Sequence, residues 1–418
     1  MTAPHKRTAA KSSPRLLAWH CLMRWDKGGV FAEALIRHEG QQLSPPDRAM
    51  LQAIVLGVLR HLRLLDHMLR ALRQNKRTQE EVRWLLLAGL CQLFVLRWPE
   101  YAVVNEMVRI APQRLRPLVN GVLRQALRRA PEWEAELPHL PLGVRYSMPD
   151  WLVERWTARW GETECRELLK SFGEPAPVCL RLNTLRPLPD IPADWQPIPG
   201  AAGWYELHDG PLPHEALAAG QIYVADPSTR YSIELLAPRP GEKILDACAA
   251  PGGKSAAILS ATGGECELLA TDAEAHRLPM LRENLQRTGA RHVQVAQHDW
   301  TRPCPRAWQG AFDAVLVDVP CSNSGVFRRR VDARWRLTPA ELRKLTAVQQ
   351  RITENAMQAL RPGGRLVYST CSIEAEEDAD MVQKLLRLHP TWRLLQDFLA
   401  LPHHLHADGA YAALLQKY

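Results

Sequence analysis

The spacing of apolar residues changes twice along the chain. From residue 14 to residue 130, apolar residues recur every three or four positions, and no stretch alternates as a strand would. This spacing is typical of amphipathic helices. The predicted helices cover residues 15–25, 47–59, 63–72, 79–96, 103–110 and 116–128. The first domain, residues 1–130, is therefore predicted to be an all-α bundle.

Residues 131–235 are rich in proline and have a weaker apolar periodicity. Within them, residues 149–161 place three tryptophans on one helical face, which favours packing at a domain interface over stacking on bases. Residues 178–186 alternate between apolar and polar positions, as a strand does. We predict that residues 131–235 form a small α+β connecting domain.

From residue 236 to residue 418, predicted strands alternate with predicted helices. The strands cover residues 243–247, 267–271, 293–297, 311–317, 365–369 and 410–416, and the helices cover 254–260, 275–288, 338–360 and 374–388. This alternation predicts a doubly wound, Rossmann-like α/β domain. Ligands of such domains bind at the carboxyl ends of the strands.

A glycine turn follows the first strand of this domain. Pro251, Gly252 and Gly253 separate the strand from the next helix, and small residues in such a turn let a ligand approach the main chain. A dinucleotide site would need Gly-x-Gly-x-x-Gly, which is absent. A Walker A loop would need a glycine at Cys248, so phosphate binding is disfavoured. The remaining interpretation is a class I methyltransferase turn that binds S-adenosylmethionine.

Three aspartates follow successive strands and favour this interpretation. Asp272 is predicted to accept the ribose hydroxyls, Asp299 the adenine amino group, and Asp318 lies near the methionine half and the substrate. Each alone could be a turn former or helix cap, whereas the three together with the turn indicate a donor site. The predicted donor-binding residues are Cys248, Ala249, Ala250, Pro251, Gly252, Gly253, Lys254, Asp272, Asp299 and Asp318.

Two cysteines follow strands that are neighbours in the usual order of this fold. Cys321 follows the fourth strand and Cys371 follows the fifth, so both thiols are expected over one pocket. Either one alone could be a buried filler residue. Beside a methyl donor, a thiolate suits methylation at carbon 5 of a pyrimidine, because its addition to carbon 6 makes carbon 5 nucleophilic. Asp318 could stabilise charge near ring nitrogen 3 and select cytosine, once the base has left its stack.

Charge is unevenly distributed over the chain. The net charge is +8, and residues 1–130 hold 22 Lys and Arg against 9 Asp and Glu. This excess favours a domain that binds a polyanion, although a solvated arginine-rich surface would have the same composition. We expect no membrane span, since no apolar run approaches the length of about 18 residues that a span needs.

Cysteine usage and the first residues bear on the compartment. The nine cysteines are scattered and form neither a Cys-x-x-Cys pair nor a zinc-ligand array. Residues 1–15 carry basic residues but no apolar core after them, so we predict a short basic tail and no secretory signal. These features predict a cytoplasmic, metal-free protein, which we expect to be a monomer.

The helical domain resembles the RNA-binding antitermination factor NusB. The resemblance rests on Asp47-Arg48-Ala49, Leu56 to Arg60, Ala102 to Glu106 and Val119 to Arg124, and it spans about 115 residues. It implies an RNA-binding helical module. The connecting domain, residues 131–235, is also expected to have an edge that faces RNA.

The remainder resembles the RNA cytosine-C5 methyltransferases of the NOL1/NOP2/Sun family. The resemblance rests on residues 246–254, 318–322 and 369–373, and on the segment 181–186, which is similar to the family's RNA-side segment. It implies S-adenosylmethionine as cofactor and RNA as partner. It also implies that Cys371 is the nucleophile and that Cys321 assists breakdown of the covalent adduct. The residues by themselves do not rank the two thiols.

The whole arrangement, with a NusB-like domain in front, resembles the bacterial Fmu/Sun-type 16S rRNA methyltransferases. We therefore expect C5 methylation of a cytosine in 16S rRNA, catalysed by Cys371, Cys321 and Asp318. The alternatives are a tRNA substrate, or a non-catalytic RNA-binding or ribosome-assembly factor with a vestigial methyltransferase fold. The chain departs from the family pattern at residues 224–228, 323–325, 330–332 and 408–411, in loops that would fit the RNA.

Overall fold

The protein is described by a computed structural model. The structure describes residues 13–76, 78–208, 210, 212–405 and 407–418. Most of the predicted basic tail, residues 1–12, lies outside the described residues. The chain forms two compact units, Met1–Glu174 and Pro175–Tyr418. The domain boundaries expected after residues 130 and 235 stay predictions.

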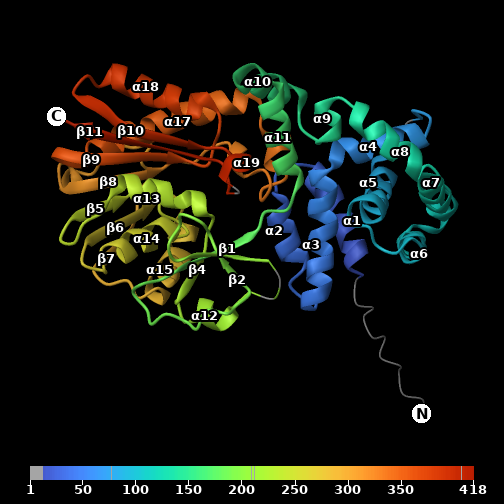
Figure 1. The fold of residues 1–418 in the computed structure, drawn as a ribbon, viewed down its shortest axis with the longest axis horizontal. Helices are drawn as coiled ribbons and strands as arrows, with labels where there is room; N and C mark the ends of the chain where they lie inside the picture. Colours follow the sequence, from blue (N-terminus) through green and yellow to red (C-terminus); the bar gives the residue numbers. More distant parts are fainter. Residues whose placement is uncertain (1–12, 77, 209, 211, 406) are drawn as a thin grey trace, which may run out of the picture. The chain divides into compact units, whose positions relative to one another are not determined.

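The described part of the first unit is helical, as the apolar spacing predicts for residues 14–130 (Figure 1), and it also includes residues 131–174, which were expected to belong to the connecting domain. Its helices are α1 (Pro14–Asp26), α2 (Ala32–Glu39), α3 (Pro45–Arg60), α4 (Leu62–Leu72), α5 (Glu80–Leu90), α6 (Glu100–Ile110), α7 (Arg116–Arg128), α8 (Ala130–Glu136), α9 (Leu142–Arg145), α10 (Asp150–Trp160) and α11 (Glu162–Gly173). Helix α2 was not predicted, because its eight residues bury only Ala32, Leu35 and Ile36 and give too short a pattern. Trp156 of α10 is fully buried and packs on Phe172 of α11, so it serves packing.

The second unit begins with a small antiparallel sheet of order β2-β3-β1-β4. Its strands are β1 (Val178–Leu182), β2 (Trp195–Pro197), β3 (Trp204–Leu207) and β4 (Ile222–Val224), with helix α12 (His214–Ala218) before β4. Asn183 ties this sheet to the rest of the unit, because its buried amide donates to the carbonyls of Gly220 and Thr288. Arg186 donates to the carbonyls of Gln286 and Arg287. These two residues of the expected RNA-side segment therefore have structural contacts.

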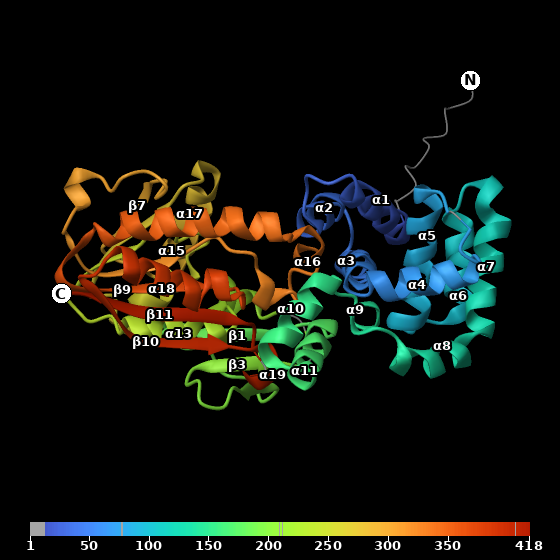
Figure 2. The same ribbon diagram turned by 90° about the horizontal axis from the view of Figure 1, so that it is seen from above.

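The larger sheet has seven strands in the order β10-β11-β9-β8-β5-β6-β7. They are β5 (Lys243–Asp246), β6 (Glu267–Asp272), β7 (Val293–Gln297), β8 (Phe312–Asp318), β9 (Leu360–Thr370), β10 (Trp392–Ala400) and β11 (Ala410–Lys417). Strands β5 to β9 pair in parallel, and β11 runs antiparallel between β9 and β10 (Figure 2). Strand β10 was missed, because it is a largely exposed edge strand whose pairing shifts between Leu394 and Gln396.

Helices cover both faces of this sheet. The helices in this part of the chain are α13 (Arg230–Leu236), α14 (Gly253–Ala261), α15 (Leu278–Arg287), α16 (Ala333–Arg336), α17 (Pro339–Met357), α18 (Ala379–Leu388) and α19 (Pro402–Leu405). Figure 1 shows α17 and α18 along one face and α13 and α14 along the other. The α/β class predicted from the alternating pattern is confirmed.

Alternate residues of the central strands supply two separate hydrophobic cores. In β8, Val315 and Val317 pack with Ile352 of α17, whereas Leu316 packs with Ile258 of α14. All of these side chains are at most 5% exposed. A strand buried on both faces reads as a continuous apolar run, which is why β8 is evident in the sequence.

The strand order brings the carboxyl ends of β5, β8 and β9 together. Asp246 pairs with Leu316, and Asp318 pairs with Ser369. The predicted adjacency of the first, fourth and fifth strands of this domain is confirmed. Among the described residues, no helix combines the length and apolar character needed to cross a bilayer.

Candidate active site

The glycine turn connects the end of β5 to the start of α14. Gly252 caps the helix with a φ of 107°, a conformation that favours glycine. A side chain at Gly253 would meet Tyr223 at 3.2 Å. The turn is held in place because the Ala249 amide donates to the Thr271 carbonyl of β6 at 2.8 Å. The main chain at Gly252 and Gly253 therefore carries no side chains at the carboxyl end of β5.

A cavity of about 220 Å³ lies over this turn. Its lining residues are Val224, Ala225, Thr229, Asp246, Cys248, Ala249, Ala250, Pro251, Gly253, Lys254 and Asp318. Seven of the ten predicted donor-binding residues thus surround one space: Cys248, Ala249, Ala250, Pro251, Gly253, Lys254 and Asp318. Burial, followed by the nearby aspartates, raises the pKa of Cys248 well above its ordinary value. The Cys248 thiol is therefore protonated and serves to line the cavity.

The other three predicted donor residues lie outside this lining. Gly252 shapes the turn. Asp272 ends β6 and accepts from the amides of Ala250 and Glu274 at 3.3 and 3.0 Å, so it braces the turn. Asp299 follows β7, where hydrogen bonds from Thr301 lower its pKa. The ribose and adenine roles of Asp272 and Asp299 stay predictions.

Asp246 is a site residue that the sequence analysis did not single out. It ends β5, is fully buried and lines the cavity. One carboxylate oxygen accepts from Ser255 Oγ at 2.6 Å, and the other has no partner among the described residues. Burial raises its pKa to about 7. An acid at the last strand position before a glycine turn was the signal that could have identified it.

Lys254 and Asp318 form an ion pair at the floor of the site. The Lys254 ammonium donates to Asp318 Oδ2 at 2.7 Å. Burial opposes the charge of Lys254, yet its pKa is raised because Asp318, and then Cys371, favour the ammonium. The predicted donor contact Lys254 is thus also a neighbour of the predicted nucleophile.

The two predicted catalytic cysteines meet, with Sγ atoms 3.1 Å apart. The hydrogen bond with Cys371 is the largest cause that raises the pKa of Cys321 well above its ordinary value, followed by burial. Asn323 bridges the pair, because its Oδ1 accepts from Cys371 Sγ and its Nδ2 donates to the Cys321 carbonyl. Cys321 is therefore a neutral thiol whose sulfur lies in contact with that of Cys371.

A second, smaller cavity of about 70 Å³ reaches Cys371. Lys254 and Thr229 line both cavities, so the two spaces are neighbours. Asp226 and Asp408 line the second cavity. A methyl donor and a planar base placed in these adjacent spaces would both lie next to Lys254, and the base would lie next to Cys371.

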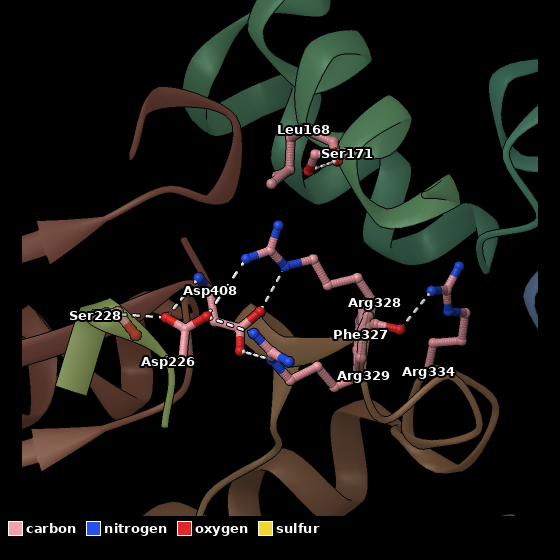
Figure 3. Close-up of polar contacts among 9 residues, drawn as sticks. All are labelled: Leu168, Ser171, Asp226, Ser228, Phe327, Arg328, Arg329, Arg334 and Asp408. Carbon is pink, nitrogen blue, oxygen red and sulfur yellow. Dashed lines mark hydrogen bonds and ion pairs between the residues drawn. The ribbon is translucent and has the colours of Figure 1, made fainter. Parts of the chain in front are cut away.

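A buried ion cluster fixes the wall of this second cavity (Figure 3). Arg328 and Arg329 donate to Asp408 at 2.6 and 2.5 Å, and Arg329 also donates to Asp226 at 2.8 Å. Burial works against the charge of Asp226, but Arg329 and two backbone amides lower its pKa. The cluster joins the segments that follow β4, β8 and α19. Asp226 and Asp408 lie in two of the loops that depart from the family pattern, residues 224–228 and 408–411.

Three family models match successive parts of the chain, in the order helical domain, connecting domain and methyltransferase domain that the sequence patterns predict. A model described as 16S rRNA methyltransferase RsmB/F matches residues 233–416. The NusB family model matches residues 12–128. A ferredoxin-like domain of RsmF/B-like methyltransferases matches residues 148–189. Both resemblances inferred from the sequence motifs are confirmed.

Similar proteins cover nearly the whole chain. The ribosomal RNA small subunit methyltransferase B of Vibrio cholerae is 35% identical over 407 residues, which span 90% of this chain and 91% of that protein. A probable ribosomal RNA small subunit methyltransferase B of Synechocystis is 31% identical over 443 residues, spanning 97% and 99%. A methyltransferase homologue from Pyrococcus horikoshii is 25% identical, with a TM-score of 0.57 over 66% of this chain and 98% of its own.

Proposed function

The chain belongs to the RsmB/F family of 16S rRNA methyltransferases, and we propose that it methylates carbon 5 of a cytosine in 16S rRNA through a covalent cysteine adduct. The observation that carries the mechanism is the 3.1 Å contact between Cys321 and Cys371 beside the Lys254–Asp318 pair. We also propose that the protein acts in the cytoplasm and as a monomer.

The cavity over the glycine turn suits S-adenosylmethionine, the cofactor of this family. Asp246 offers a buried carboxylate oxygen that has no partner in the described part of the chain, which fits a cationic group of the donor. Gly253 lines this cavity without a side chain, so the donor can approach its main chain closely. When bound, S-adenosylmethionine supplies a methyl group on a positively charged sulfur, and carbon 5 of the cytosine takes that methyl group.

Cys371 begins the reaction as the thiolate. Its sulfur forms a bond to carbon 6 of the cytosine, and the electron pair of the carbon 5–carbon 6 double bond becomes available at carbon 5. The Lys254 ammonium, whose charge Cys371 and Asp318 favour, stabilises the thiolate before it attacks. Asp318 is placed to contact the ring near nitrogen 3 and to favour cytosine over uracil.

Cys321 assists the breakdown of the adduct. Once Cys371 is a neutral thioether, the largest cause that raises the pKa of Cys321 is gone, so Cys321 can ionise more readily. Its thiolate can then accept the proton from carbon 5. The double bond re-forms as the bond from carbon 6 to the Cys371 sulfur breaks, and Cys371 leaves as a thiolate.

The test is methyl transfer from labelled donor to deproteinised RNA. We expect the label on 16S rRNA, and nuclease digestion should release it as 5-methylcytidine. Label on tRNA alone would assign the activity to a tRNA substrate. Lack of label on 16S rRNA, 23S rRNA and tRNA, with donor binding intact by calorimetry, would refute catalysis and favour an RNA-binding assembly factor.

A further inference from the structure

One buried carboxylate lies behind the two reactive cysteines. Glu377 ends a short 3-10 helix, Ala375–Glu377, that follows β9, and it is completely buried. It does not line either cavity described above. No arginine or lysine of the described ranges forms an ion pair with it, and a buried carboxylate in that position is costly unless hydrogen bonds surround it.

Four donors supply those hydrogen bonds. Glu377 Oε1 accepts from the Ser322 amide at 2.9 Å and from Gln349 Nε2 at 2.8 Å. Glu377 Oε2 accepts from Ser372 Oγ at 2.5 Å and also from Ser322 Oγ. The carboxylate therefore binds the loop after β8 and the loop after β9 at once.

Three of these four hydrogen-bond donors belong to residues that lie next to the two cysteines in the sequence. Ser322 directly follows Cys321, and Ser372 directly follows Cys371. Gln349 of α17 donates to Glu377 and also to the carbonyl of Pro320, the residue before Cys321. The Glu377–Gln349 pair thus holds the main chain on both sides of Cys321.

We propose that Glu377 is a positioning residue that holds the Cys321 thiol against Cys371 and thereby governs how fast the covalent adduct is resolved. This role deepens the proposed function and rests on it. Apart from this geometry, Glu377 contributes, after Cys371 and burial, to the raised pKa of Cys321.

The first experiment follows the fate of the adduct in Glu377→Gln. The amide puts a donor where a carboxylate oxygen accepts, so the two cysteine loops lose their common anchor. We expect turnover to fall about tenfold to a hundredfold. Donor affinity should not change, and a protein–RNA adduct should accumulate. Glu242→Gln is the matched control. Glu242 accepts from Arg239 and Arg365 at the opposite end of the sheet, so its variant should keep wild-type turnover.

The second experiment needs neither RNA nor methyl donor. Oxidised glutathione can convert the two thiols to a disulfide with release of two reduced glutathione molecules. The equilibrium constant gives the effective concentration of Cys321 at Cys371, and mass spectrometry identifies the linked peptides. Glu377→Gln should lower this effective concentration about tenfold or more. Glu242→Gln should not change it.

The two experiments separate failure of this proposal from failure of the proposed function. If wild-type protein does not methylate RNA, the disulfide equilibrium still tests the positioning role. The role is wrong if Glu377→Gln leaves the effective concentration and the adduct level at wild-type values. It is also wrong if the variant merely melts at a lower temperature. Should Glu377→Gln not fold, Gln349→Met removes one anchor on the Cys321 side and should show the same effects to a smaller degree.

Discussion

At the scale of single residues, Cys321 and Cys371 differ in their surroundings although their sulfur atoms touch. Cys371 is a neighbour of the Lys254 ammonium, whereas Cys321 is the thiol whose ionisation its partner suppresses. Such an arrangement lets two identical groups take different tasks, as coupled titrating pairs do. The family resemblance assigns the nucleophile to Cys371, and these contacts support the same order.

Removing each thiol should have a different effect. Cys371→Ala should abolish turnover without any adduct, because no sulfur attacks carbon 6. Cys321→Ala should form the adduct and release it slowly, so a covalent protein–RNA species should accumulate on a denaturing gel. The opposite pattern would mean that the two roles are exchanged.

Asp246 should make donor binding and stability depend on pH in opposite ways. Burial raises its pKa from 3.8 to about 7, so the folded protein favours the neutral carboxyl. The stability cost of charging it grows as pH rises between these two values and is constant above about 7. Asp246→Asn avoids this cost, so its melting temperature should exceed that of the wild type by a margin that grows up to about pH 7.

Affinity for the donor should rise with pH, whereas stability falls. In the wild type, affinity for the cationic donor should increase as pH rises through about 7, where Asp246 becomes charged. Asp246→Asn should bind the donor more weakly above that pH, with a flat pH profile by calorimetry. Equal profiles for the two proteins would exclude Asp246 from the donor site.

At the scale of elements, the segments buried on both faces were the most predictable. Strand β8 and the glycine turn have local signals, namely an apolar run and small residues before a helix. Strand β10 lacks such a signal, because only two of its nine residues are buried and its pairing is irregular. Glu377 could not be recognised, since its donors at 322, 349 and 372 meet only through tertiary structure.

The buried ion cluster should be essential for stability. Asp226→Asn removes a buried carboxylate that pairs with both Arg328 and Arg329, so we expect a loss of about 3–5 kcal/mol. Because the pKa of Asp226 is lowered, its contribution is present at neutral pH and is lost as pH falls. Lys344→Gln, which breaks an exposed pair with Glu341, should cost less than about 1 kcal/mol. Similar losses in urea unfolding of the two variants would contradict this account.

At the scale of the whole molecule, the charge distribution suggests that the helical region binds the RNA backbone and the methyltransferase domain performs catalysis. Residues 1–130 carry the excess of arginine, whereas the remaining residues have a slight excess of acid. A basic surface supplies affinity for phosphates without sequence specificity, and the catalytic pocket must then select the base. The NusB-like part is thus expected to bring RNA to the enzyme.

Binding to 16S rRNA should therefore weaken steeply as salt increases. Replacing the exposed Arg114, Arg124 and Arg128 by glutamine should lower affinity and reduce the log–log salt slope by about 0.7–0.9 for each phosphate that the protein no longer neutralises. Replacing the exposed Arg343, Lys384 and Arg387 by glutamine changes the net charge equally and should have a smaller effect. Equal slopes for the two triple variants, measured by filter binding, would show that the helical region does not hold the RNA.

The most direct test of the account traps the enzyme on its base. A 16S rRNA transcript that contains 5-fluorocytidine cannot lose a proton from carbon 5, so the adduct should persist after methyl transfer. We predict that mass spectrometry of the digested complex finds the methylated nucleotide attached to Cys371. Attachment to Cys321, or methyl transfer without any protein–RNA bond, would contradict the mechanism.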